Sequence, residues 1–366
     1  MPIFDLDTPA LVVDFDKMER NIARMQNIAD DAGVKLRPHT KTHKTPAIAQ
    51  MQLRAGARGI TVAKVGEAEV MEAANIIDIL IAFPLQGATK IERLLKLNER
   101  ANLRVSLDSF KVARDLSDAA AARQQRVKIL VEVDPGYHRV GVLPNGPVRD
   151  LVREITKLPG IEFIGVMTHA GHAYAAKEIE EVAEIAEQEG NVVVESAEYL
   201  RGAGIEVQEV SVGSTPTAPF VARVPGVTAI RPGNYVFYDA MQVALHSCLP
   251  DDCALTVIGT VVAKHPDRII FDTGAKALTS DKLPPHHGTG HGIVKGYEKN
   301  LVIERLSEEH ATVKIADSSH LPEIGDKIEI IPNHACPTVN LFDKFYAARK
   351  GQVIGEYEIP GRGKTQ

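Results

Sequence analysis

The chain has 366 residues, about twice the usual size of one domain, and this length predicts a barrel-sized domain followed by a smaller one. Hydrophobic residues make up 44% and charged residues 25%, an ordinary globular composition that excludes a fibrous or natively unfolded protein. The 42 Lys and Arg against 48 Asp and Glu leave a formal net charge of -6, which gives no electrostatic reason to bind nucleic acid and favours small-molecule chemistry.

The N-terminus and the cysteines predict a soluble cytoplasmic protein. The first residues, MPIFDLDTPALVVDF, are acidic where a signal peptide needs basic residues, and no apolar stretch of the chain is long enough to span a bilayer. The three cysteines, Cys248, Cys253 and Cys336, are an odd number and too few for a disulfide framework, which favours a reducing compartment. We therefore expect no membrane partner.

Short β-branched runs alternate with amphipathic stretches along the first two thirds of the chain. The strand-like runs cover residues 10–15, 34–38, 59–63, 78–83, 103–108, 128–134, 162–171, 206–213 and 228–239. Helix-like stretches lie between them, including a long one over about 177–202. Because the alternation persists for about eight units and no G-x-G-x-x-G follows the first strand, a (β/α)₈ barrel of TIM type is favoured over an open doubly wound sheet.

The pattern changes after about residue 245. The later strand-like runs are bounded by Gly, Pro, Asn or Asp, no long amphipathic helix separates them, and they cover residues 254–264, 268–274, 300–306, 311–316, 326–332 and 352–359. The sequence therefore predicts an α/β chain with a barrel over residues 1–245 and a β-rich domain over residues 246–366. Residues 1–9 could pack on either part.

The segment LRPHTKTHKTP, residues 36–46, places basic side chains where the second run of the alternation ends. Residues two apart share a face of an extended backbone, so His39, Lys41 and His43 are expected to project together at the carboxyl end of a barrel strand. Barrel enzymes keep their active sites at that end. Cations held close together depress one another's proton affinity, which favours a lysine that forms a Schiff base.

Two other strand ends carry candidate catalytic groups. In VEVDPGYHRVGV, residues 131–142, Arg139 follows a turn made by Pro and Gly and is a candidate for an anion or cofactor contact. In MTHAGHAY, His169 and His172 lie beside a glycine at the exit of the seventh run. Imidazole titrates near neutral pH, so either histidine is a candidate general base.

Two turns after late strands contain small residues, glycine and hydroxyls. They are SVGSTPT at residues 211–217 and RPGNYVFYD at residues 231–239. Turns of this kind can present backbone N–H groups to a phosphate, which is a recurrent site of barrels. Together they favour a phosphate-bearing ligand.

The segment IPNHACPTVNLFD in the β-rich part contains a candidate metal pair. His334 and Cys336 are two apart on a strand-like stretch, so both side chains can reach one metal ion. Two protein ligands are too few for a closed structural site, so a metal held here would keep open positions and could act as a Lewis acid. The segment HHGTGHG, with His286, His287 and His291, is interpreted as a flexible loop or lid rather than a metal site.

These segments, in this order, resemble the fold-type III pyridoxal-phosphate enzymes, in which an alanine-racemase-like barrel precedes a β domain. The similarity is closest to the metal-activated branch that contains D-threonine aldolase, 3-hydroxy-D-aspartate aldolase and eukaryotic-type D-serine dehydratase. It runs over nearly the whole chain, through DTPALVVD, RPHTKTHK, GARGITVAKVGEAE, VEVDPGYHRVGV, RPGNYVFYD and PNHACPTVNLFD. RPHTKTHK with a distant PNHACPTVNL is highly specific as a pair.

The resemblance implies a role for each candidate residue. Lys41 would hold pyridoxal 5'-phosphate covalently, and His334 with Cys336 would bind a divalent metal, Mn²⁺, Mg²⁺ or Zn²⁺. Cofactor contacts are implied for Arg139, His169, Gly213, Ser214, Thr215, Gly233, Asn234 and Tyr235. The resemblance further implies a homodimer and a small D-3-hydroxy amino acid as substrate.

The implied reaction is retro-aldol cleavage of D-threonine and similar D-3-hydroxy amino acids to glycine and an aldehyde. Dehydration of D-serine or 3-hydroxy-D-aspartate by the same groups is the alternative. In the aldolases Asp stands at the second metal position, whereas Cys336 resembles the dehydratases and favours zinc. The aldolase Tyr before the seventh-strand His is Thr168 here, and matching the catalytic His to His172 requires a small gap, so His169 and His172 are both candidate bases. A racemase without metal is disfavoured by the His-x-Cys pair.

Overall fold

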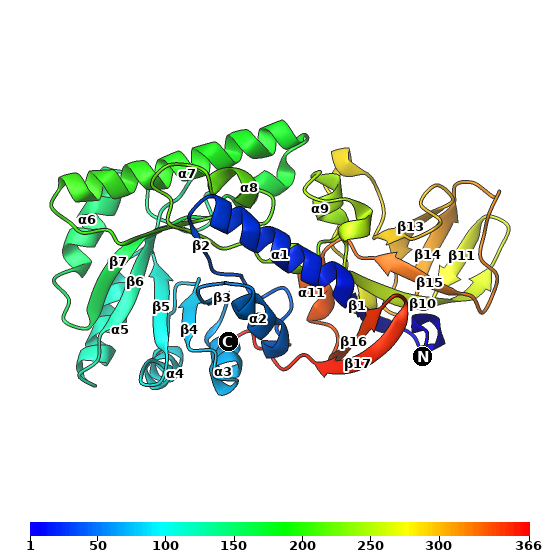
Figure 1. The fold of residues 1–366 in the computed structure, drawn as a ribbon, viewed down its shortest axis with the longest axis horizontal. Helices are drawn as coiled ribbons and strands as arrows, with labels where there is room; N and C mark the ends of the chain where they lie inside the picture. The colour runs from blue at the N-terminus through cyan, green and yellow to red at the C-terminus, as the bar shows by residue number, and fades with distance from the viewer.

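The computed structural model describes residues 1–366 and contains two sheets, one of eight and one of nine strands. Figure 1 shows the eight-stranded sheet surrounded by helices at one end of the molecule and the nine-stranded sheet at the other. The predicted fold class, a (β/α)₈ barrel followed by a β-rich part, is confirmed. The boundary predicted at residue 245 stays a prediction.

The barrel strands are all parallel to their neighbours, in the order β2-β9-β8-β7-β6-β5-β4-β3. Their bounds are β2 Lys35–Leu36, β3 Ile60–Val62, β4 Asp78–Ile81, β5 Asn102–Leu107, β6 Val127–Glu132, β7 Ile161–Met167, β8 Glu209–Val212 and β9 Ala229–Ile230. A parallel bridge between His39 and Thr61 joins the segment after β2 to β3. This bridge closes the sheet into a barrel, and a closed sheet has no exposed edge strand.

Helices cover the outside of the barrel, and most of the longer ones carry an apolar stripe that packs against the strands. They are α1 Phe15–Asp31, α2 Pro46–Arg54, α3 Val65–Ala73, α4 Ala88–Asn98, α5 Phe110–Ala121, α6 Gly146–Ile155, α7 Ile179–Gly202 and α8 Ala218–Val221. In α4, for example, Ile91, Leu94 and Leu95 are buried at helical spacing. The C-terminus lies beside α3 (Figure 1), where the Gly66 N–H donates to the carbonyl group of Gln366.

Seven strands of the nine-stranded sheet follow the order β13-β14-β11-β10-β1-β16-β17. The other two are β15, which pairs with β10, and β12, which pairs with β15. Its strands are β1 Ala10–Asp14, β10 Leu255–Lys264, β11 Arg268–Phe271, β12 Ile293–Val294, β13 Leu301–Leu306, β14 Ala311–Ile315, β15 Lys327–Ile331, β16 Lys344–Arg349 and β17 Gln352–Glu358. Short helices α9 Ala240–Ala244, α10 Ala275–Leu278 and α11 Ala335–Val339 accompany them. Five 3₁₀ turns complete the chain: η1 Ile3–Asp5, η2 Gly171–Ala175, η3 Asn234–Val236, η4 Pro250–Asp252 and η5 Pro285–His287.

The structure corrects the prediction at the first strand. Residues 10–14 were expected to open the barrel, but β1 lies in the other sheet, where it pairs antiparallel with β10 and parallel with β16. The helix α1 that follows contacts both β2 of the barrel and β16 of the second sheet. The N-terminal strand and helix therefore connect the two parts of the molecule, and the barrel begins with β2.

Charged side chains gather near the amino-terminal ends of the barrel strands. The Arg104 guanidinium lies 2.7 Å from Asp78 Oδ1, and Arg37, which is buried, lies 2.5 Å from the same oxygen. Glu209 completes the network at 3.7 Å from Arg37 Nε. Buried charges are stable only when paired in this way.

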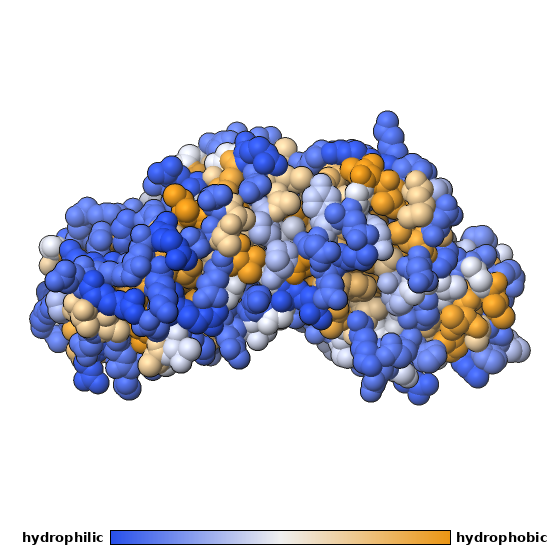
Figure 2. Space-filling model, turned by 90° about the horizontal axis from the view of Figure 1, so that it is seen from below, coloured by the Kyte–Doolittle hydropathy of each residue, from blue (hydrophilic) through white to orange (hydrophobic).

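The outer surface is mostly hydrophilic in the view of Figure 2, with hydrophobic side chains gathered in small separate patches. None of the helices combines the length and the apolar character that crossing a bilayer would require.

Candidate active site

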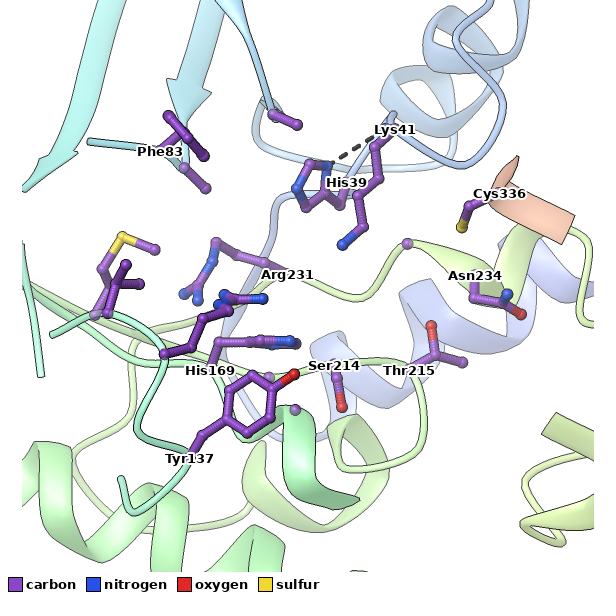
Figure 3. A pocket seen from close by; sticks show the side chains of 18 of the residues that line it. His39, Lys41, Phe83, Tyr137, His169, Ser214, Thr215, Arg231, Asn234 and Cys336 are labelled. Atoms are coloured by element: carbon purple, nitrogen blue, oxygen red, sulfur yellow. Dashed lines mark hydrogen bonds between the residues drawn. The ribbon is translucent and has the colours of Figure 1, made fainter. Parts of the chain in front are cut away.

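A cavity of about 490 Å³ lies at the carboxyl ends of the barrel strands. Its lining includes residues that follow β2, β3, β4, β8 and β9, together with the last residues of β6 and β7. His334 and Cys336, which begin α11 of the second part, complete the lining. Figure 3 shows Cys336 facing the cavity across from the barrel side chains. The volume falls within the range of about 300–1,000 Å³ that is usual for small-molecule sites.

Lys41 projects into this cavity from a tight turn after β2. The turn forms because the Thr40 carbonyl group accepts hydrogen bonds from the N–H groups of His43 and Lys44, at 3.1 and 2.7 Å. The Lys41 N–H donates to His39 Nδ1 at 3.4 Å, and His39 also lines the cavity. The structure thus brings His39 and Lys41 together as expected.

His43 and Lys44 point elsewhere, which corrects the prediction that His39, Lys41 and His43 share a face. The chain turns instead of continuing as a strand, so His43 is buried with its Nε2 3.2 Å from Gln52 Oε1. Lys44 is also buried and pairs with Glu67. Lys41 is therefore the one lysine that lines the cavity.

Burial and neighbouring charges lower the pKa values of three basic groups of the cavity, Lys41, His39 and His169. Burial lowers the pKa of the Lys41 amine, and the guanidinium groups of Arg139 and Arg231 lower it further against the opposing effects of Cys336 and Glu67. Burial, and then the charge of Lys41, lower the pKa values of His39 and His169 well below the usual value. A neutral amine can attack a carbonyl carbon, and a neutral imidazole can accept a proton.

The two glycine-containing turns meet beside Lys41, as their predicted role requires. Gly213 has φ +99°, and a Cβ atom on Gly233 would lie 2.8 Å from the His39 carbonyl oxygen, so neither position tolerates a side chain easily. The Tyr235 N–H donates to Thr215 Oγ1 at 3.1 Å and thereby joins the two turns. Gly213, Ser214, Thr215, Gly233 and Asn234 all line the cavity.

Besides His43, the predicted site residues Tyr235 and His172 do not line the cavity. Tyr235 is fully buried, and its hydroxyl accepts a hydrogen bond from Gln52 Nε2 at 2.9 Å. The Tyr137 ring, which does line the cavity, lies with its centroid 6.0 Å from those of both His169 and His172. Of the two candidate bases, the structure therefore places His169 at the cavity.

Arg231 and Glu189 were not predicted and support the centre of the site. Arg231 is buried, and its guanidinium donates to Ser211 Oγ at 2.6 Å and to the Thr168 carbonyl group. Glu189, on α7, accepts from the N–H groups of Ala170 and Gly213 at 3.2 and 2.9 Å and thereby ties the exits of β7 and β8 together. Only the place of Arg231 at the start of RPGNYVFYD could have drawn attention to it in the sequence.

The His334–Cys336 pair enters the cavity because α11 begins there. The Ala335 N–H donates to the buried Asp239 carboxylate at 2.8 Å, which fixes the first turn of α11 against the barrel. Cys336 Sγ lies 3.2 Å from Thr42 Oγ1. Burial would lower the pKa of His334, but Cys336 and a hydrogen bond with Asp281 raise it to about 11. Burial by itself would raise the pKa of the Cys336 thiol. The charge of His334 and its hydrogen bond outweigh that effect, so the pKa of the thiol is lowered.

The residues present fit pyridoxal phosphate and an open metal site. The cavity lining contains three Lys and Arg side chains but a single carboxylate, Glu132, which favours an anionic ligand. Asn234 Oδ1 is buried without a hydrogen-bond partner beside the two turns, as expected where a ligand supplies the missing donor. No group of three or more His, Cys, Asp or Glu side chains forms a metal cage. The two donors His334 and Cys336 suit a metal that keeps open positions for a substrate.

Comparison with known proteins identifies relatives over the full length of the chain. Residues 13–240 match the family model described as the alanine racemase N-terminal domain, and residues 254–348 match a putative serine dehydratase domain. D-threo-3-hydroxyaspartate dehydratase of Delftia sp. (strain HT23) is 36% identical over 96% of this chain and 97% of its own length. D-threonine aldolase of Arthrobacter sp. is 34% identical over 99% of this chain and 94% of its own. The crystal structure of D-threonine aldolase from Filomicrobium marinum superposes with a TM-score of 0.92 at 33% identity, covering 100% of this chain and 98% of that chain.

Proposed function

The chain belongs to the family of the alanine racemase N-terminal domain, joined here to a putative serine dehydratase domain, and we propose that it is a pyridoxal-phosphate- and divalent-metal-dependent lyase that cleaves D-threonine and similar D-3-hydroxy amino acids. The observation that carries this proposal is the meeting of Lys41 from the barrel with His334 and Cys336 from the second part in one cavity. That arrangement puts an amine and a pair of metal donors within reach of one small substrate. The homodimer implied by the resemblance stays a prediction.

The cofactor would supply an electron sink for the carbon atom that bears the amino group, and the metal would lower the proton affinity of the hydroxyl it contacts. Lys41 would hold the cofactor, and Ser214 and Thr215 would offer hydroxyl groups to its phosphate from the turn after β8. Arg139, whose guanidinium lies 4.0 Å from Glu132, would contact the cofactor from the mouth of the cavity.

His169 is the base that this proposal assigns to the 3-hydroxyl group of the substrate. Its imidazole is neutral because burial and Lys41 lower its pKa, so it can accept the hydroxyl proton as the Cα–Cβ bond breaks. Lys41 in its protonated form would then deliver a proton to Cα to give glycine, and the lowered pKa of its amine makes that proton easier to release. Both residues line the cavity, whereas His172 does not.

Dehydration is the second candidate, and the thiol at position 336 favours it. If Lys41 removes the Cα proton first, the hydroxyl group leaves and no carbon–carbon bond breaks. A soft thiolate donor favours Zn²⁺ over Mn²⁺ or Mg²⁺. A dehydratase is also among the relatives that match over the full length.

Product analysis with D-threonine, D-serine and L-threonine distinguishes the candidates. We expect purified protein supplied with pyridoxal phosphate and Zn²⁺ or Mn²⁺ to convert D-threonine to glycine and acetaldehyde in equal amounts. L-threonine serves as the control of opposite configuration and is expected to stay intact. Formation of 2-oxobutanoate and ammonia from D-threonine, or of pyruvate and ammonia from D-serine, in place of glycine would replace the aldolase by the dehydratase.

A further inference from the structure

A carboxylate outside the cavity lining contacts the proposed metal ligand His334 from behind. Asp281 Oδ2 lies 2.8 Å from His334 Nδ1. A ring nitrogen that faces a carboxylate at this distance carries a proton and donates it. When the ring is neutral, as a metal ligand must be, its lone pair therefore lies on Nε2. In proteins, histidines that bind metals commonly donate their second nitrogen to a carboxylate in this way.

The backbone around Asp281 is anchored to the strand end that carries His334. Asn333 Nδ2 donates to the carbonyl groups of Asp281 and Gly290, at 3.0 and 2.9 Å. The Asp281 N–H donates to Thr279 Oγ1 at 3.3 Å. Since Asn333 immediately precedes His334, the same short segment supplies the metal ligand and fixes the loop that holds the carboxylate.

The loop is also attached to the barrel. His287 Nε2 lies 2.7 Å from the Ala176 carbonyl oxygen and His286 Nε2 lies 3.4 Å from it. Ala176 follows η2 at the exit of β7, one turn beyond the segment that carries His169. The histidine-rich loop therefore lies between the two halves of the site and is held at both, which fixes Asp281 in space although its side chain is half exposed.

We propose that Asp281 is a positioning residue that orients His334 and fixes its tautomer, so that Nε2 is presented to a divalent metal in the cavity. This inference rests on the proposed function, because it requires that His334 and Cys336 bind a metal. Asp281 does not line the cavity, so it would act only through His334. A half-exposed ion pair adds little to folding, so its removal should change metal binding and leave the fold intact.

The test compares the affinity of the cofactor-loaded protein for Zn²⁺ among three variants, by competition with a chromophoric chelator. Asp281→Ala is expected to bind Zn²⁺ about 10–100-fold more weakly than wild type, the usual effect of removing such a partner. The Zn²⁺ affinity of Asp281→Asn should lie between those of wild type and Asp281→Ala. The amide oxygen of Asn can still accept the hydrogen bond from His334 Nδ1, but it carries no charge. Asp317→Ala is the matched control, since Asp317 lies in the loop after β14 and its exposed carboxylate accepts hydrogen bonds only from Ser319.

Cofactor absorbance and unfolding temperature are expected to stay unchanged in all three variants. Asp281→Ala protein that binds Zn²⁺ within about twofold of wild type would overturn the positioning role alone. Equally weakened Zn²⁺ binding in Asp317→Ala would also overturn the positioning role of Asp281, because the effect would then come from the loss of any negative charge. Wild-type protein that binds neither Zn²⁺ nor Mn²⁺ would instead overturn the proposed metal dependence, and this inference with it.

Discussion

Replacing Lys41 by alanine is expected to lower turnover by about 10⁴-fold or more and to abolish the visible absorbance of the lysine-bound cofactor. Lys41 is the only lysine in the cavity lining, and it is proposed both to hold the cofactor and to move a proton at Cα. The loss therefore combines weaker cofactor retention with the loss of a proton carrier. Steady-state cleavage of D-threonine and the absorbance spectrum of the purified variant measure the two effects separately.

Two neighbouring lysines provide controls of different quality. Lys64 lies outside the cavity lining with its Nζ 3.4 Å from the centre of the Phe83 ring, so Lys64→Ala should keep the cofactor absorbance. Lys44→Ala should also keep it, but this change leaves the buried carboxylate of Glu67 without its partner, at a cost of about 3–5 kcal/mol in stability. Absorbance that survives in Lys41→Ala but disappears in Lys64→Ala would contradict the assignment.

Cys336 carries the second large effect. If its thiolate binds the metal, Cys336→Ala should weaken metal binding by about 100-fold or more and reduce turnover by a similar factor, because only His334 remains as a protein ligand. Cys336→Asp should keep a site but shift its preference from Zn²⁺ toward Mn²⁺, since carboxylate oxygen replaces thiolate sulfur. Metal content after dialysis and turnover with each ion measure both variants.

A cysteine with a purely structural role predicts the opposite pattern. Cys336→Ala would then be nearly silent, and Cys336→Asp would mainly destabilise the fold by burying a charge. Cys253, which is buried and outside the cavity, offers the matched control Cys253→Ala. An active Cys336→Ala variant with unchanged metal content would contradict the proposal that Cys336 binds a metal required for turnover.

The barrel could be predicted because its signal is local. Each strand and helix of the alternation shows its own period within about ten residues, and eight such units in a row leave few other folds. The error at residues 10–14 has the same origin: β1 is followed by an amphipathic helix, as a barrel strand would be, but its partners β10 and β16 lie more than 230 residues away. The partners of a strand are not encoded in its periodicity.

The site could be predicted in part for similar reasons. The carboxyl ends of barrel strands converge on one side of the barrel. This convergence brings His39 and Lys41, after β2, into the same cavity as the Gly213–Thr215 turn after β8. His43 was assigned incorrectly because the two-residue period of a strand no longer applies once the chain turns at Thr40. Glu189 and Asp281 could not be found, because each acts through contacts with segments distant in the sequence and neither lies in a motif.

Borohydride reduction of the cofactor-loaded protein tests the central claim most directly, because it converts a lysine–cofactor imine into a stable amine that survives digestion. The account predicts that peptide mass mapping finds the pyridoxyl group on Lys41 alone. A label on Lys44 or Lys64, or protein that takes up no pyridoxal phosphate before reduction, would contradict it.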